Sequence, residues 1–260
     1  MDSENRSSDF KIAVLSDVNG NLEALTCVLA ELKNEGIEDV LFLGDAIGYG
    51  ANPVECLALL RARANTYILG RLEQAIVCGK LDAYNSKVRG MLEWTRDELN
   101  HAPSRDDEVA PLSWLRERKN LYRKNDLVAV HGPNTWDEET YMFNNVNVDL
   151  VGQLSNRVQG FRILLIGDNH EPWALSCKRG KVRADSNMDN IKLEADDSFI
   201  ISVGSVGQPR DGDPRACFAI VSPQTVVWRR VPYDIEATAR KMGENPVLHS
   251  GWANRLRKGI

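Results

Sequence analysis

The chain has no long hydrophobic run, few cysteines and no excess of basic residues. No apolar stretch approaches the roughly 20 residues of a membrane-spanning helix, so we expect no membrane association. The five cysteines are odd in number, scattered and without CxxC spacing, which favours reduced thiols over a disulfide framework. The net charge of −5 argues against general nucleic-acid binding, because proteins of that class usually carry a basic surface.

What remains is the composition of an ordinary globular protein. Hydrophobic residues make up 43% and charged residues 27% of the 260 positions. A chain of this length has room for one large core or two modest ones, and we expect a single domain over residues 1–260. Residues 1–9 are polar and lack the apolar stretch of a signal peptide, so we expect a disordered start and a cytoplasmic protein.

Apolar runs alternate with helical periodicity in the first part of the chain, which predicts an α/β fold. Strand-like runs cover residues 12–15, 40–43, 66–69, 127–130 and 163–166. Apolar residues recur at helical spacing from residue 22 to Gly36 and again after Pro53, which predicts a helix in each place. Two further amphipathic stretches lie between residues 82 and 119.

Short strands separated by turn signals dominate the second part of the chain. They cover residues 173–177, 191–193, 199–203, 216–221 and 225–231, with residues 185–190 as a hairpin loop. We expect these strands to form a second, more antiparallel sheet, followed by a last helix over residues 235–242. Arg255, Arg257 and Lys258 then belong to a solvated tail.

Polar residues follow four of the strand-like runs, where an α/β sheet places its chemistry. They are Asp17 and Asn19, Asp45, His131, and Asp168 with His170. A lone aspartate after a strand is more often the N-cap of the next helix, and a lone histidine is often packed in a loop. The coincidence of four such positions favours a shared site.

Two longer segments carry a family resemblance. Residues 44–50 (GDAIGYG) and 204–210 (GSVGQPR) resemble the calcineurin-like metallophosphoesterase superfamily, in particular small bacterial phosphodiesterases and diadenosine-tetraphosphatase-like phosphoesterases. The resemblance runs from Lys11 to at least Val231. It implies a four-layer sandwich of two mixed β-sheets flanked by helices. It also implies a site in which two metals clamp a phosphate and activate a hydroxide.

Several positions depart from the family pattern of D-x-H-G-N, G-N-H-D and G-H-T-H. Asn19 stands in place of a metal-binding histidine, and Asp168 in place of another. Arg71 replaces an asparagine ligand, and Leu72 replaces the histidine that assists the leaving group. Ser202 and Val203 also stand where the family has Asn-Pro. The departures affect the second metal position more than the first.

The residues that match the family retain one plausible metal position. The resemblance assigns Asp17, Asp45 and His170 to the first metal, where Asn19 offers an amide oxygen. These donors suit Mn, Fe, Zn or Ni. At the second position only Asp45 and His131 are kept, with Asp168 as a possible further ligand. We therefore expect at most one divalent transition metal, with none as the alternative.

Arg71 cannot bind a metal, because its guanidinium stays protonated and has no lone pair to donate. We interpret Arg71 and Asp168 as an ion pair that replaces the second metal, with Arg71 and Arg210 as phosphate-binding residues. An equally open interpretation of the loop that ends at Arg210 is a purely structural turn. Glu73, without a histidine beside it, faces either Arg71 or solvent. Trp136 and Tyr141 either line the cleft or pack in the core.

Three functions remain open. The first is a degenerate metallophosphoesterase that binds a phosphorylated small molecule, nucleotide or partner with little hydrolysis. The second is an active phosphoesterase, for a monoester or diester, that uses one metal and Arg71. The third is a scaffold that keeps only the fold, and an oligomer is compatible with each.

Overall fold

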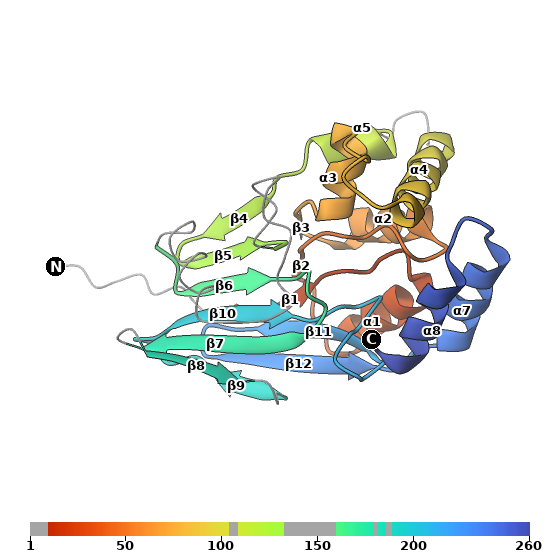
Figure 1. Cartoon of the computed structure of the whole chain (residues 1–260). Helices are drawn as coiled ribbons and strands as arrows, with labels where there is room; N and C mark the ends of the chain where they lie inside the picture. The colour runs from red at the N-terminus through yellow and green to blue at the C-terminus, as the bar shows by residue number, and fades with distance from the viewer. Residues whose placement is uncertain (1–9, 104–108, 133–159, 179–180, 186–188) are drawn as a thin grey trace.

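Two six-stranded mixed sheets form the centre of the molecule (Figure 1). The computed structural model describes residues 10–103, 109–132, 160–178, 181–185 and 189–260. The disorder expected for residues 1–9 and the two aromatic positions Trp136 and Tyr141 therefore lie outside the described residues. The expected fold class, α/β with two mixed sheets, is confirmed.

The first sheet has the strand order β3-β2-β1-β11-β12-β9. Its strands are β1 (Ile12–Leu15), β2 (Val40–Phe42), β3 (Thr66–Tyr67), β9 (Asn190–Lys192), β11 (Ala216–Val221) and β12 (Thr225–Val231). β1, β2 and β3 run parallel, whereas β11 pairs antiparallel with β1 and β12. The carboxyl ends of β1, β2 and β3 therefore meet at one edge of the sheet.

The second sheet has the order β4-β5-β6-β10-β7-β8. Its strands are β4 (Leu121–Lys124), β5 (Leu127–Val130), β6 (Ile163–Ile166), β7 (Pro172–Lys178), β8 (Lys181–Asp185) and β10 (Ser198–Val203). β5, β6 and β10 run parallel, and their carboxyl ends also meet at one edge. β4 and β8 pair antiparallel with β5 and β7, and the sequence pattern did not predict either strand.

The core between the sheets follows from the alternation of side chains along each strand. Leu127 and Ala129 of β5 face Val14 and Leu41 of the first sheet, within one buried cluster. The next residues on β5, such as Val128, belong to a separate cluster on the outer face of the second sheet. Helices over that outer face, the fourth layer of the expected sandwich, are not seen in the described ranges.

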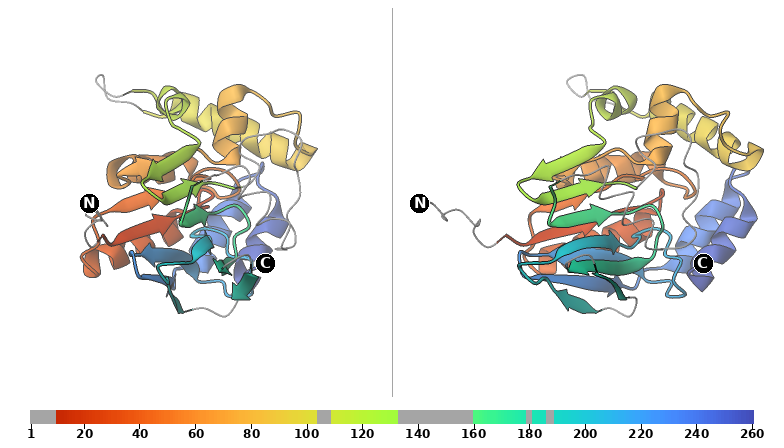
Figure 2. Two further views of the ribbon diagram at one scale, coloured as in Figure 1. Left: turned by 90° about the vertical axis from the view of Figure 1, so that its left-hand side faces the viewer. Right: turned by 60° about the vertical axis from the view of Figure 1, so that its left-hand side comes forward.

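Helices cover the outer face of the first sheet and the carboxyl ends of the strands. They are α1 (Leu22–Asn34), α2 (Pro53–Arg63), α3 (Arg71–Cys78), α4 (Ser86–His101), α5 (Pro111–Arg116), α7 (Ile235–Glu244) and α8 (Ser250–Lys258). Both views of Figure 2 show α3, α4 and α5 grouped apart from α7 and α8. In the described part of the chain, no helix combines the length and apolar character needed to cross a membrane.

The chain end differs from the expected solvated tail. Arg255, Arg257 and Lys258 lie on α8, a helix whose apolar side buries Trp252 and Leu256. Arg257 and Lys258 are exposed, as expected. The helix itself was missed, because the interpretation used the charge of the segment and not its spacing: Trp252 and Leu256 are four positions apart and so share one helix face.

Candidate metal centre

The expected site residues lie on the loops that follow the parallel strands of both sheets. Asp17 and Asp45 follow β1 and β2, and His131 follows β5. Asp168 and His170 follow β6, and Arg71 is the first residue of α3 after β3. Because the two sheets face each other, the sets of loops converge on one centre.

The loop backbone is unusual at the same residues. Asp17, Asn19, Asp45, Asp168 and His170 all adopt positive φ, between 49° and 70°. This left-handed conformation is uncommon for residues other than glycine, although Asp, Asn and His adopt it more readily than most. Such clustering is typical of functional sites, where strain is held by the surrounding structure.

Backbone hydrogen bonds join the loops to one another. Asp17 N donates to Gly44 O (3.0 Å), and Gly207 N donates to Asp17 O (2.9 Å). Glycine is needed where the loops cross: a Cβ at Gly207 would collide with Val18 O, and one at Gly70 would collide with the Asp45 carboxylate. The loop that ends at Arg210 therefore builds the site directly.

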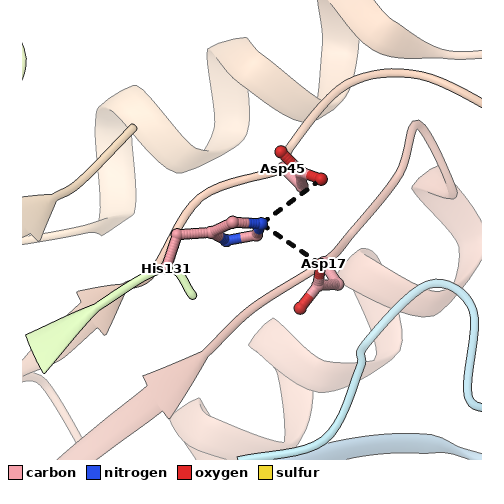
Figure 3. A group of neighbouring side chains, drawn as sticks. All are labelled: Asp17, Asp45 and His131. Atoms are coloured by element: carbon pink, nitrogen blue, oxygen red, sulfur yellow. Dashed lines mark ion pairs between the residues drawn. The ribbon is translucent and has the colours of Figure 1, made fainter. Parts of the chain in front are cut away.

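Asp17, Asp45 and His131 form the central group (Figure 3). Their ligand atoms lie within 4.8 Å of one another, and all three side chains are buried. His131 Nε2 is 3.4 Å from Asp45 Oδ2 and 3.9 Å from Asp17 Oδ1. The structure thus brings His131, expected at the second metal position, to both carboxylates.

Both histidines are oriented by the backbone. His131 Nδ1 lies 2.8 Å from Leu43 O, and His170 Nδ1 lies 2.7 Å from Gln208 O. Each Nδ1 therefore carries the proton that it donates to a carbonyl, and each Nε2 faces the carboxylates. His170 Nε2 is 3.2 Å from Asp17 Oδ1. A metal-ligating histidine commonly shows this arrangement.

The residues fit a divalent cation. Asp17 Oδ1, Asn19 Oδ1 and His131 Nε2 are buried and lack a hydrogen-bond partner within the described residues. Buried polar atoms are nearly always satisfied, so such atoms gathered at one point are suited to bind a cation. Oxygen and imidazole donors together match Mn, Fe, Zn or Ni.

The carboxylates and His131 shift one another's pKa. Burial raises the pKa of Asp17, but the charges of His170 and His131 outweigh burial and hold that pKa below its usual range. The pKa of Asp45 is also lowered, against the effect of burial, chiefly by His131. Burial opposes protonation of His131, yet Asp45 and Asp17 raise its pKa to about 10.

Arg71 and Asp168 form the expected ion pair. Arg71 Nη2 lies 2.6 Å from Asp168 Oδ1, which is 3.7 Å from His131 Nε2. The charge of Arg71 also contributes to the lowered pKa of Asp45. The Arg71 guanidinium thus lies next to Asp168 and contributes positive charge near His131 and Asp45. Asp168 N in turn donates to Asp17 Oδ2 (3.0 Å), which ties the two sheets together.

The sequence suggested that Glu73 faces Arg71 or solvent, and the structure shows that it faces neither. It is fully buried and accepts hydrogen bonds from the backbone N–H groups of Asp45 (2.9 Å), Ala46 (2.6 Å) and Gly70 (2.9 Å). Tyr67 Oη donates to the same carboxylate at 3.1 Å. Burial and the charge of Asp45 raise the pKa of Glu73 to about 7. Its position three residues after Gly70, typical of a capping box, was the missed signal.

Leu72 is buried in the apolar core. A Cβ at Gly48 would lie 2.6 Å from Leu72 Cδ1 and 3.4 Å from Met91 Sδ, so Gly48 leaves room for the leucine. The backbone N of Leu72 donates to Asp45 Oδ1 (2.9 Å). Leu72 therefore supports the centre through its backbone, whereas its side chain offers no group for proton transfer.

Comparison with known proteins decides the family. The profile of the calcineurin-like phosphoesterase superfamily domain matches residues 10–225. The chain belongs to this superfamily. It is 31% identical over 238 residues to the "Uncharacterized protein MJ0912" of Methanocaldococcus jannaschii, covering 90% of this chain and 92% of that protein.

Two solved structures agree with the fold. A metallophosphoesterase from Sphaerobacter thermophilus superposes with a TM-score of 0.75 at 29% identity, covering 96% of this chain and 99% of that one. The hypothetical protein PH1004 from Pyrococcus horikoshii superposes with a TM-score of 0.71 at 20% identity, covering 96% and 98%. The second likeness concerns the fold alone.

Proposed function

We propose that this superfamily member is a cytoplasmic protein that binds one divalent transition metal and a phosphorylated ligand, with little hydrolysis. The observation that carries the proposal is the Arg71–Asp168 ion pair of 2.6 Å beside His131. A fixed guanidinium next to Asp45 supplies positive charge where the family pattern has a second metal. A second cation close to Arg71 would be repelled.

One metal is proposed at Asp17, Asp45 and His131, with His170 and Asn19 beside them. When bound, the metal would supply Lewis acidity to a phosphoryl oxygen. Protein side chains beside the metal would bind the phosphate of the ligand. Arg71 and Arg210 are the cations that would contact it, because guanidinium matches phosphate geometry.

Weak hydrolysis is proposed because the centre has lost its proton donor. General acid–base help is worth about two to four orders of magnitude in rate. Leu72 stands in that position, and its side chain packs beside Gly48 and Met91. The alternative is an active one-metal phosphoesterase in which Arg71 stabilises the charge of the transition state. The loss of three imidazoles of the family pattern, at Asn19, Leu72 and Asp168, favours binding over turnover.

Three measurements on the purified protein separate the proposals: metal content, orthophosphate binding and hydrolysis of bis-p-nitrophenyl phosphate. One metal with phosphate binding and near-background hydrolysis supports the proposed function. Turnover of roughly one per second or faster supports the one-metal enzyme. Neither metal nor phosphate binding would leave only a scaffold.

A further inference from the structure

The loop between β10 and β11 contacts His170 and carries Arg210. Gln208 O lies 2.7 Å from His170 Nδ1, and Arg210 N donates to His170 O (3.2 Å). The Arg210 side chain is tied to the same loop, because its Nη2 donates to Gln208 Oε1 (2.9 Å). The position of the Arg210 guanidinium therefore depends on where this loop lies relative to the metal centre.

The next residues of the loop are held from two sides. Asp211 forms an ion pair with Arg230 of β12, and Gly212 N donates to Gly259 O at the end of α8 (2.8 Å). A Cβ at Gly259 would lie 2.8 Å from Asp213 C and 2.9 Å from Asp213 N. The end of α8 thus lies so close to the loop backbone that only glycine fits there.

Helix α8 is itself fixed to the body of the molecule. Its apolar side buries Trp252 and Leu256. The ring of Trp252 packs edge to face against Tyr49, in the loop after β2, with centroids 5.1 Å apart. Arg257 pairs with Glu236 of α7 at 2.7 Å. Because the loop after β2 also carries a carboxylate of the metal centre, α8 is a support whose position is set relative to that centre.

The end of a helix explains the conformation of Gly259 but not its contact. Gly259 has φ of 63° and donates to Leu256 O (3.3 Å), as glycines that end helices commonly do. Gly36 and Gly79 follow α1 and α3 with φ of 66° and 70°, and a Cβ at either would meet no other described segment within 4 Å. Gly259 differs from both because it is pressed against the backbone of another segment.

We propose that Gly259 is a positioning residue for phosphate binding, which fixes the loop that sets Arg210 beside the metal. The inference rests on the proposed function, in which Arg210 contacts the phosphate of the ligand. Gly212, which Gly259 holds, is two residues from Arg210, so a displacement of the loop at Gly212 moves the Arg210 guanidinium. The effect is selective, because other loops carry the proposed metal ligands Asp17, Asp45 and His131.

The test measures manganese and orthophosphate binding to Gly259→Ala by titration calorimetry, at a temperature at which every variant is folded. Manganese affinity should equal that of wild type. Orthophosphate affinity of the manganese-loaded protein should fall about tenfold, the scale of one charge-assisted hydrogen bond. A general loss of structure would lower both affinities, so the split between them identifies positioning.

A second variant, Gly259→Asn, separates the contact from backbone strain. Asparagine adopts the left-handed conformation more readily than alanine does, but it has the same Cβ. It should therefore lose phosphate affinity to the same extent as Gly259→Ala. Recovery of wild-type phosphate affinity with asparagine would show that strain alone is responsible and would overturn the inference.

Gly36→Ala is the matched control. It places alanine in the same left-handed conformation after a helix, without a neighbouring backbone, so it should change neither affinity. Wild-type phosphate affinity in Gly259→Ala, equal losses of both affinities, or failure of both Gly259 variants to fold would each show that the contact serves only the fold. The proposed function would survive those results. If wild-type protein binds no orthophosphate, the proposed function fails and the inference fails with it.

Discussion

The carboxylate of Glu73 holds the backbone of Asp45 in place, because Glu73 Oε2 accepts the N–H of Asp45 at 2.9 Å. The same oxygen accepts Gly70 N, while Glu73 Oε1 accepts Ala46 N. Asp45 sits in a left-handed conformation, with φ of 57°. By fixing the backbone of Asp45, Glu73 positions the Asp45 carboxylate in the metal centre.

Replacing Glu73 with Gln should destabilise the protein although the side chains are nearly the same size. An amide NH2 in place of either oxygen would face at least one backbone N–H, because Oε2 accepts from Asp45 and Gly70 and Oε1 accepts from Ala46. A buried unsatisfied donor costs about 1–3 kcal/mol. Urea unfolding of the metal-free protein measures the loss. Tyr67→Phe, which removes one donor at 3.1 Å, is the control and should cost less. Equal stability of Glu73→Gln and wild type would refute the positioning role.

The Arg71–Asp168 pair is suited to a double-mutant cycle. The two side chains are 28% and 16% exposed, so the pair is neither a surface bridge nor fully buried. Each single change to alanine should cost between the roughly 1 kcal/mol of exposed pairs and the roughly 3–5 kcal/mol of buried ones. The double variant should lose less than the sum, since neither charge is then left alone. Additive losses would contradict a coupled pair.

Metal stoichiometry follows from the charge of Arg71. Elemental analysis after incubation with excess manganese should find at most one metal per chain. Asp17→Asn should abolish binding, because Asp17 lies 3.2 Å from His170 Nε2 and 3.9 Å from His131 Nε2. Asp39→Asn, at an exposed position, is the control. Two well-occupied metals per chain would contradict the proposal.

The stability of the metal-free protein should depend on pH through His131. The pKa of His131 is about 10 in the folded protein and about 6.5 in the unfolded chain. The stabilisation of the folded state by protonated His131 is therefore fully present below about pH 6.5 and is lost as the pH rises through about 10. The difference in unfolding free energy between wild type and His131→Asn should therefore shrink between pH 6.5 and 10. Saturating manganese should abolish the trend, because the metal takes the place of the proton. A constant difference in the metal-free protein would disprove this account.

Restoring hydrolysis should require several changes together: Asn19→His, Arg71→Asn, Leu72→His and Asp168→His. Groups that act as a unit are strongly non-additive, so single reversions should recover little activity on bis-p-nitrophenyl phosphate. Leu72→His alone should also cost stability, because the leucine packs beside Gly48 and Met91. A single reversion that restores turnover of roughly one per second would contradict the loss of a cooperative centre.

Most of the helices and strands follow from local patterns in the sequence, but their grouping into sheets does not. The strands of the second part of the chain, expected to form one sheet, are divided between both: β9, β11 and β12 join the first sheet, and β7 and β10 join the second. Alternation and periodicity are properties of neighbouring residues, so β1, α1 and β5 lie where those patterns predict them. β3 ends at Tyr67 and not at residue 69 because Ile68 forms an isolated bridge to Lys119, a partner distant in the chain. Strand ends depend on such pairing, and the chain alone does not reveal it.

The metal centre, too, is determined partly by the sequence and partly by the tertiary structure. The sequence shows which residues follow the parallel strands, and the paired change at Arg71 and Asp168 is readable there because opposite charges replace two ligands together. Two further contacts come from tertiary packing alone: His131 Nε2 lies near the carboxylates of both Asp17 and Asp45, and Glu73 accepts hydrogen bonds from the backbone of Asp45 and Ala46. Each of them joins separate segments through left-handed loops and the packing of two sheets, and no local pattern encodes that geometry.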